Sequence, residues 1–258
     1  MSYQIDKHYI TYRLFDSHPE MTAFSTTRHG GVSDGTYATF NCTIHGGDSP
    51  EHVNRNLQLL SGSLPNQPDR YIIPRQCHKN TICFIEDKDT EYNLEDVDAV
   101  VTNIPKVCVC VSTADCVPIL LYDSAKHVVA AVHSGWRGTV IRIIETTIDA
   151  LKQRYDCNSS DILACIGPSI SLAAFEVGNE VYDTFHHAGF DMRLIARHYN
   201  KWHIDLWEAN RQILLSKGVL DKHIEVSGIC TYYNNEDFFS ARRLGKKSGR
   251  ILNGIMLL

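Results

Sequence analysis

Residues 107–139 read VCVCVSTADCVPILLYDSAKHVVAAVHSGWRGT, and they determine the fold expected for the chain. Two apolar runs with the composition of strands each lead to a soft metal ligand, Cys116 in one case and His133 in the other. Turn-forming residues stand next to both ligands. In a layered α/β protein, side chains at strand ends meet in one crevice, where ligands usually bind. The stretch therefore predicts an α/β fold with a metal site, or a nucleophile and its base, at the strand ends.

Hydrophobic patterning extends this expectation to the whole chain. We expect strands at 10–15, 22–27, 71–75, 81–85, 99–101, 107–111, 119–122, 128–133, 162–166, 224–229 and 251–257. The clearest helix is expected to begin after Gly138 and to run to Tyr155, with others at 50–60, 180–187 and 206–217. Strands outnumber helices, and helices separate groups of strands. This order favours one mixed α/β domain over residues 1–258.

Composition narrows the class of partner. The chain has 258 residues, 43% of them hydrophobic and 21% charged, and a formal net charge of -5. This charge argues against a broad nucleic-acid surface, and no apolar run approaches the roughly 20 residues that span a bilayer. Nine cysteines without disulfide-like spacing, and no leader pattern at the N-terminus, predict a cytoplasmic protein with reduced thiols. We expect small-molecule partners and a monomer or homodimer.

His78 is the best third ligand for Cys116 and His133, because it also follows an apolar run. Two histidines and one cysteine leave an open fourth position on zinc, as in catalytic sites. Zinc lowers the pKa of a bound water from about 15.7 to about 7. We predict Zn²⁺, with copper as the less favoured metal. The alternative is a buried thiol and two histidines that bond to backbone carbonyls.

Several charged residues and one turn are candidates for anion binding or acid–base chemistry. The turn at 135–139 contains Gly135 and Arg137, and its free N–H groups suit phosphate or carboxylate. A tight turn packed by Trp136 explains the same residues. Further candidates are the arginines Arg28, Arg242, Arg243 and Arg250 and the carboxylates Asp48, Asp98, Asp115 and Glu176. Solvated arginines and helix-capping carboxylates are the competing interpretation.

A set of motifs covers nearly the whole chain in one order. They are STTRHGGVS at 25–33, TADCVPILLYD at 113–123, AAVHSGWRGT at 130–139, IGPSI at 166–170, FEVGNEV at 175–181 and FFSARR at 238–243. In these the chain resembles the YfiH family, also called multicopper polyphenol oxidoreductase or laccase-like and described as purine nucleoside phosphorylases. The resemblance implies a four-layer α/β/β/α sandwich, similar to cysteine-hydrolase toxins. It places the zinc ligands on His78, Cys116 and His133.

The resemblance also implies an activity, namely phosphorolysis of adenosine, inosine and methylthioadenosine, with adenosine deamination as a side activity. On this interpretation the catalytic residues are Cys116, His133, Asp115 and Arg28. Nucleoside and phosphate are expected at Gly135, Arg137, Glu176, Arg242 and Arg243. The sequence departs from the family pattern at Cys77, Lys79 and Ser169, which bears on the shape of the pocket.

Three other functions remain open. A copper-dependent polyphenol oxidase needs several copper centres rich in imidazole, and the chain has no His-x-His pair. A cysteine hydrolase or amidase that edits muropeptides would use Cys116 as nucleophile and His133 as base. A zinc-stabilised interaction module would close the site with a fourth protein ligand and would turn over no nucleoside.

Overall fold

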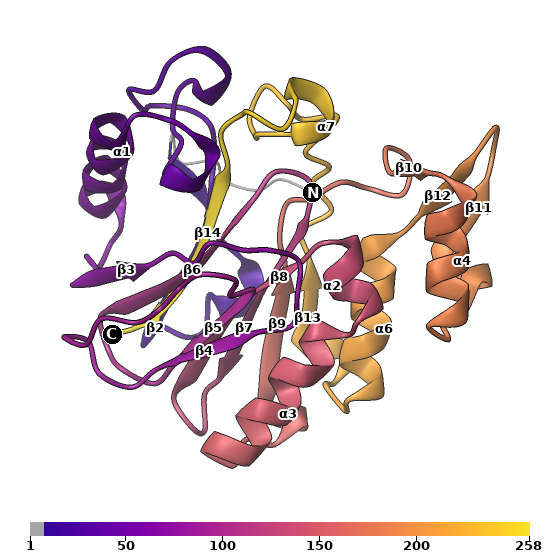
Figure 1. The fold of residues 1–258 in the computed structure, drawn as a ribbon. Helices are drawn as coiled ribbons and strands as arrows, with labels where there is room; N and C mark the ends of the chain where they lie inside the picture. The colour runs from indigo at the N-terminus through magenta and orange to yellow at the C-terminus, as the bar shows by residue number, and fades with distance from the viewer. Residues whose placement is uncertain (1–7) are drawn as a thin grey trace.

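Two β-sheets form the centre of the molecule (Figure 1), and the computed structural model describes residues 8–258. The first seven residues of the predicted domain lie outside this range. One sheet has five strands in the order β1 (Tyr9–Ile10), β2 (Met21–Thr26), β14 (Ile251–Leu257), β6 (Val107–Thr113) and β3 (Arg70–Ile72). The other has six, in the order β13 (Ile224–Val226), β9 (Ile162–Ile166), β7 (Val117–Asp123), β8 (Val128–Ser134), β5 (Ala99–Thr102) and β4 (Ile82–Ile85).

The two sheets pack face to face through alternate residues of their strands. Val109 and Ile255 of the five-stranded sheet share one buried cluster with Leu120 and Val129 of the six-stranded sheet. Neighbouring strands run antiparallel except in the pairs β3–β6, β4–β5 and β13–β9. The central strands β7 and β8 are buried on both faces, and they are apolar except for Asp123 at the end of β7 and His133 and Ser134 at the end of β8.

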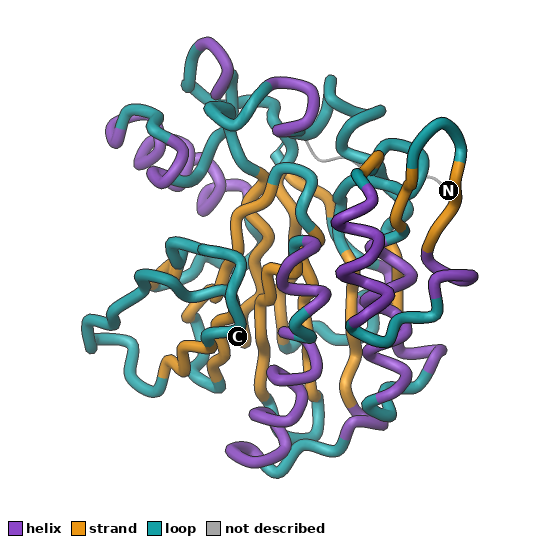
Figure 2. The backbone as a smooth tube through the Cα atoms, turned by 45° about the vertical axis from the view of Figure 1, so that its right-hand side comes forward, coloured by secondary structure: helices purple, strands orange, loops and turns teal. Residues whose placement is uncertain are grey.

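Helices cover the two outer faces (Figure 2). On the five-stranded sheet, Leu60 of α1 (Pro50–Ser63) joins a cluster with Phe24 and Cys108. On the six-stranded sheet, α3 (Ile143–Tyr155) and α6 (Leu206–Ser216) pack their apolar faces on the strands, with Ile144 and Ile213 fully or almost fully buried.

A third, smaller sheet projects from the side of this body (Figure 1). It contains β10 (Glu176–Val177), β12 (Trp202–Ile204) and β11 (Ala196–His198), accompanied by α4 (Asn179–His187) and α5 (Met192–Ile195). Tyr182 of α4 stacks on Trp202 with ring centroids 3.9 Å apart, which attaches the helix to the sheet. In the described residues, 8–258, the other helices are α2 (Trp136–Val140), α7 (Ala241–Leu244) and five short 3₁₀ turns at Arg13–Phe15, Gly35–Tyr37, Ile44–Gly46, Ser159–Asp161 and Asp221–His223.

The mixed α/β class expected from the sequence is confirmed. The strand expected at 10–15 is wrong beyond Ile10, because the chain turns into a 3₁₀ helix at 13–15. The helix expected after Gly138 begins earlier, at Trp136, and breaks at Arg142, whose φ of 58° lies in the left-handed region. The three strands of the small sheet went unpredicted, because runs of two or three residues carry little periodic signal. Among the described residues, no helix is long and apolar enough to cross a membrane.

Gly254 allows β14 to fit between its neighbours. A Cβ atom at this position would lie 2.5 Å from Phe24 Cζ and 2.9 Å from Cys108 Sγ. We expect Gly254→Ala to lower the free energy of unfolding by about 1–3 kcal/mol through overpacking. Gly62→Ala is the matched control, because nothing lies within 4 Å of its added carbon and α1 gains a better helix former. Denaturant titration measures both, and equal stabilities of the two variants would contradict the prediction.

Candidate active site

The antiparallel pairing of β7 and β8 places Cys116 and His133 at one end of the six-stranded sheet. Pro118 lies opposite His133, and Val117 lies opposite Ser134, so Cys116 enters β7 where β8 ends. Ser134 donates to Asn210 Oδ1 at 2.7 Å and contacts the Thr139 hydroxyl at 3.0 Å. These buried contacts fix the 135–139 turn against α6.

The side chains of His78, Cys116 and His133 converge, although they are far apart in the sequence. Their three possible ligand atoms lie within 4.8 Å of one another, and Cys116 Sγ is 3.8 Å from His78 Nε2. Ligands bound to one tetrahedral zinc at about 2.0–2.3 Å are about 3.3–3.8 Å apart. The donor set and its spacing therefore fit a zinc ion. Within residues 8–258 no fourth His, Cys, Asp or Glu belongs to this group, which leaves one side open.

Asp98 positions both His78 and His133 through hydrogen bonds. It is fully buried, and its carboxylate accepts hydrogen bonds from the backbone N–H groups of His78 (2.9 Å), Lys79 (2.9 Å) and Cys77 (3.2 Å). These bonds stabilise His78 in the left-handed region at φ 65°. Asp98 Oδ1 also lies 2.7 Å from Nδ1 of His133. This contact places a proton on Nδ1 and leaves Nε2 of His133 for a metal.

Charges within the group shift three pKa values. Burial favours neutral Asp98, but the hydrogen bonds from His133 and the backbone outweigh it and lower the pKa of the carboxyl to about 2. Burial likewise favours neutral Cys116, yet the neighbouring charge on His133 lowers the pKa of the thiol to about 6. Burial also favours a neutral imidazole, but the Cys116 thiolate and Asp98 raise the pKa of His133 to about 9. Without a metal, Cys116 and His133 are therefore a thiolate–imidazolium pair.

A cavity of about 490 Å³ opens on the ligand cluster. Its lining combines the three possible ligands with basic side chains and neutral polar groups, and it contains no Asp or Glu. The lining residues are Thr43, His45, Gly46, Arg75, Gln76, His78, Ser112, Thr113, Ala114, Cys116, His133, Arg137, Ala241, Lys246 and Arg250. This volume is within the range of small-molecule sites.

Gly135 and Arg137 lie at this site, as the sequence suggested. A Cβ on Gly135 would lie 2.9 Å from both Cys116 Sγ and His78 Cδ2, so only glycine permits the cluster to close. The guanidinium of Arg137 stacks over the ring of Trp136 at 4.1 Å, and Arg137 lines the cavity. α2 has only five residues, so its macrodipole at this turn is small.

Asp115 and Arg28 contact protein groups around the cavity and do not line it. Asp115 accepts from the Thr231 hydroxyl at 2.7 Å and from the backbone N–H of Arg242 at 2.6 Å, so it links the Cys116 loop to α7. Arg28 donates to the carbonyls of Ala38 and Asn235. Their catalytic roles stay predictions.

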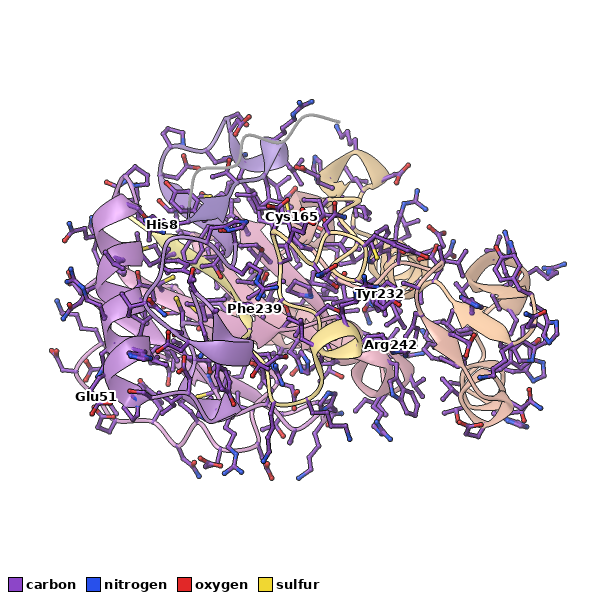
Figure 3. The ribbon with its side chains drawn as sticks, turned by 90° about the horizontal axis from the view of Figure 1, so that it is seen from above. His8, Glu51, Cys165, Tyr232, Phe239 and Arg242 are labelled. Carbon is purple, nitrogen blue, oxygen red and sulfur yellow. The ribbon has the colours of Figure 1, made fainter. Side chains whose placement is uncertain are left out.

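Arg242, Arg243 and Glu176 also lie outside the cavity lining. Figure 3 shows Arg242 at α7, on the side of the molecule toward the small sheet. Its side chain donates to the carbonyl of Glu176 in β10 at 3.2 Å. Arg243 packs over Tyr232 at 5.2 Å, and the Glu176 carboxylate pairs with Lys201 at 2.7 Å. Substrate contacts by these three residues stay predictions.

The structure adds cavity residues to which the sequence analysis gave no role, namely Arg75, Gln76, His45 and Lys246. Gln76 both donates to and accepts from Ser112 of β6, which sets the position of the segment that leads to His78. Arg75 and Gln76 stand just before a predicted ligand in the sequence, and this proximity was the available signal. Nothing in the sequence indicated that residues near 45 and 246 meet.

Substitution of Gly135 tests the close approach of the ligands. We expect Gly135→Ala to push Cys116 and His78 apart and to weaken zinc binding about tenfold or more. The fold is expected to survive, because the added methyl group faces the cavity wall. Competition with a zinc chelator measures the affinity, with Gly62→Ala as control. An unchanged zinc affinity would show that Gly135 does not control how closely Cys116 and His78 approach each other.

Several known proteins are similar to this chain over most of its length. A family model described as multi-copper polyphenol oxidoreductase laccase matches residues 22–258. The chain is 46% identical to a purine nucleoside phosphorylase of Bacteroides thetaiotaomicron, with 98% of this chain and 97% of that protein covered. It is 39% identical to the adenosine deaminase RL5 of an unknown prokaryotic organism, with 90% and 92% covered. It is 36% identical to the purine nucleoside phosphorylase YfiH of Escherichia coli, with 92% and 94% covered.

Solved structures show the same fold. The Bacillus licheniformis hypothetical protein YfiH superimposes with a TM-score of 0.92 at 28% identity, over 99% of both chains. YlmD from Geobacillus stearothermophilus gives a TM-score of 0.91 at 30% identity, over 99% of this chain and 98% of that one.

Proposed function

Since this chain belongs to the multi-copper polyphenol oxidoreductase laccase family, to which YfiH belongs, we propose that it is a zinc-dependent purine nucleoside phosphorylase with an adenosine deaminase side activity. Relatives that carry both names support the enzyme class. The observation that carries the proposal is the cavity itself. It combines a His–Cys–His cluster, open on one side, with basic side chains and no carboxylate.

This lining suits phosphorolysis. An oxygen of hydrogen phosphate attacks C1′ of the ribose, and the bond from C1′ to the purine nitrogen breaks. The electron pair of that bond goes to the base, and the proton of hydrogen phosphate ends on a base nitrogen. The products are the free base and ribose 1-phosphate. The basic residues bind the attacking anion, while Gln76, Ser112 and Thr113 offer neutral hydrogen-bonding groups for the sugar.

His78, Cys116 and His133 are the residues that would hold the zinc ion. Bound there, zinc supplies a positive charge that polarises an atom of the substrate. Asp98 keeps the protonated nitrogen of His133 away from the ion, and the turn at Gly135 keeps the ligands close. We propose the same cavity for the deaminase side activity, in which water replaces the 6-amino group of adenosine and ammonia leaves.

The direct test is to incubate the zinc-loaded protein with adenosine, inosine or methylthioadenosine, with and without phosphate. We expect free base and a sugar 1-phosphate only when phosphate is present. Release of base without phosphate would instead identify a nucleoside hydrolase. Elemental analysis of the same preparation is expected to give one zinc per chain, and several coppers per chain would favour the oxidase.

A specific observation supports a second candidate, the cysteine amidase that edits muropeptides. His133 lies between Cys116 and the Asp98 carboxylate, in the order of a nucleophile, a base and an orienting group. Metal-free protein incubated with a muropeptide would then form an acyl adduct at Cys116, detectable by mass spectrometry. The absence of this adduct, together with phosphorolysis by the zinc form, would exclude the amidase.

Other expectations from the sequence are part of the same proposal. The packing of helix on sheet on sheet on helix supports the four-layer arrangement. The likeness to cysteine-hydrolase toxins, a single domain over 1–258, a cytoplasmic location and a monomer or homodimer stay predictions.

A further inference from the structure

Two loops from opposite parts of the chain meet at one wall of the cavity. A Cβ on Gly46 would lie 3.4 Å from the carbonyl oxygen of Ser248. The backbone N–H of Gly249 donates to the Thr36 carbonyl at 3.0 Å, and that of Arg250 donates to Asn41 Oδ1 at 3.0 Å. In Figure 1 the segment around α7 lies beside the N-terminal loops at the same end of the sheets. We name this surface, formed by His45, Lys246 and Arg250, the cationic wall.

Arg250 gives the cationic wall a fixed positive charge. Its Nη1 donates to the carbonyls of Ser248 and Gly249, and its Nη2 donates to that of Lys246. Among residues 8–258 no carboxylate forms a direct ion pair with Arg250. Burial lowers the pKa of this arginine, while the nearby charges of Cys116 and Asp115 oppose that shift. These charges compensate the partly buried cation without direct contact, so an anionic ligand bound to Arg250 would stabilise it further.

Of the other arginines that line the cavity, Arg75 pairs with Glu95 at 3.1 Å, whereas Arg137 stacks on Trp136 without an ion pair among the described residues. Lys246 likewise has no ion-pair partner in the described part of the chain, although the protein as a whole carries a net charge of -5. Lys246 and Arg250 lie together, since Arg250 donates to the Lys246 carbonyl, so two positive charges without a direct ion pair are adjacent on the cationic wall.

We infer that the cationic wall is the subsite for inorganic phosphate, with Lys246 and Arg250 as its two charged contacts. This inference rests on the proposed function for its role in turnover, while phosphate binding can be measured without a nucleoside. Arginine and lysine are the usual partners of a tetrahedral dianion. The assignment moves the phosphate contacts away from Arg242 and Arg243, which pack on Phe175 and Tyr232 outside the cavity lining.

Substitution of two adjacent lysines gives a matched test. Lys246 lines the cavity and Lys247 does not, so Lys246→Met removes a charge from the wall and Lys247→Met removes one beside it. In the zinc-loaded protein we expect Lys246→Met to raise the KM for phosphate about tenfold while the KM for inosine stays within about twofold. Lys247→Met is expected to leave both constants unchanged. Sulfate, a dianion of the same shape, is expected to inhibit wild type more strongly than Lys246→Met.

Arg250 is tested separately, because its loss also frees the loop that it braces. Arg250→Lys keeps the charge but removes the planar fork that bonds to the loop carbonyls, so it is expected to lower the melting temperature as well as to weaken phosphate binding. Isothermal titration with inorganic phosphate alone measures this binding.

The outcomes separate the subsite from the proposed function. Equal phosphate affinities in wild type and Lys246→Met would overturn the subsite, even if the enzyme is a phosphorylase. Phosphate binding that depends on Lys246, in a protein that cleaves no nucleoside, would support the subsite and refute the phosphorylase. An equal rise in the KM for phosphate in Lys247→Met would also overturn the subsite. The effect would then come from the loss of any positive charge near the cavity and not from a contact with Lys246.

Discussion

Cys116→Ala is expected to lose its zinc and at least about 100-fold of its phosphorolysis of inosine. The thiolate is one of three ligands, and loss of a mere supporting residue around a metal already costs about 10–100-fold in affinity or activity. Only the imidazoles of His78 and His133 would then remain, 38 and 17 residues from position 116 along the chain. The ligand cluster of the described residues would have no anionic donor left. Zinc content by elemental analysis and initial rates with saturating phosphate measure the effect.

Cys83→Ala is the control for Cys116→Ala. Cys83 lies on the edge strand β4, is half-buried and is absent from the ligand cluster. It is expected to keep one zinc per chain and near wild-type rates. Full phosphorolysis by Cys116→Ala would show that neither the metal nor the thiolate takes part, and the proposed function would then rest on the basic residues alone.

Asp98→Asn is expected to lower both the stability of the metal-free protein and the zinc affinity. The amide that replaces the carboxylate carries no charge to balance protonated His133. Its NH₂ group also cannot accept the hydrogen bonds that the backbone N–H groups of Lys79 and Cys77 donate to the carboxylate. Breaking one partner of a buried ion pair costs about 3–5 kcal/mol, which corresponds to about 10 °C in melting temperature for a chain of this size. Zinc affinity is expected to fall about 10–100-fold.

Asp96→Asn is the matched control, because Asp96 lies two residues away, is largely exposed and pairs only with Lys79 and the Cys77 thiol. Its effect on the melting temperature is expected to be small. The pH profile adds a second check. The folded pKa of Asp98 is depressed to about 2, so its stabilisation is complete above the unfolded pKa and is lost as the pH falls toward 2. The difference between wild type and Asp98→Asn should therefore shrink on acidification, and a constant difference would argue against an ionised Asp98.

The sequence was a good guide wherever a local pattern sufficed. The apolar runs 117–121 and 128–132 adjoin Cys116 and His133, so the positions of the two strands and of these two residues could be predicted. Asp98 could not be assigned, because its role depends on backbone N–H groups about twenty residues away along the chain. The cationic wall could not be predicted for the same reason. His45, Lys246 and Arg250 line the same cavity but stand in distant loops that have no hydrophobic periodicity. The catalytic role suggested for Arg28 stays a prediction, and in the structure its donors bond to carbonyl groups.

The position of β14 has a consequence for how the protein is made. This strand lies between β2 and β6, and the hydroxyl of Ser25 donates to Asn253 Oδ1, 228 residues further along the chain. Contacts of such long range slow folding, because a large loop must close before they form. During translation β2 can pair with β1, and β6 with β3, but the strand edges that β14 joins stay unpaired until the residues of β14 leave the ribosome. Unpaired strand edges favour aggregation, so the nascent chain is most vulnerable to it before β14 is synthesised.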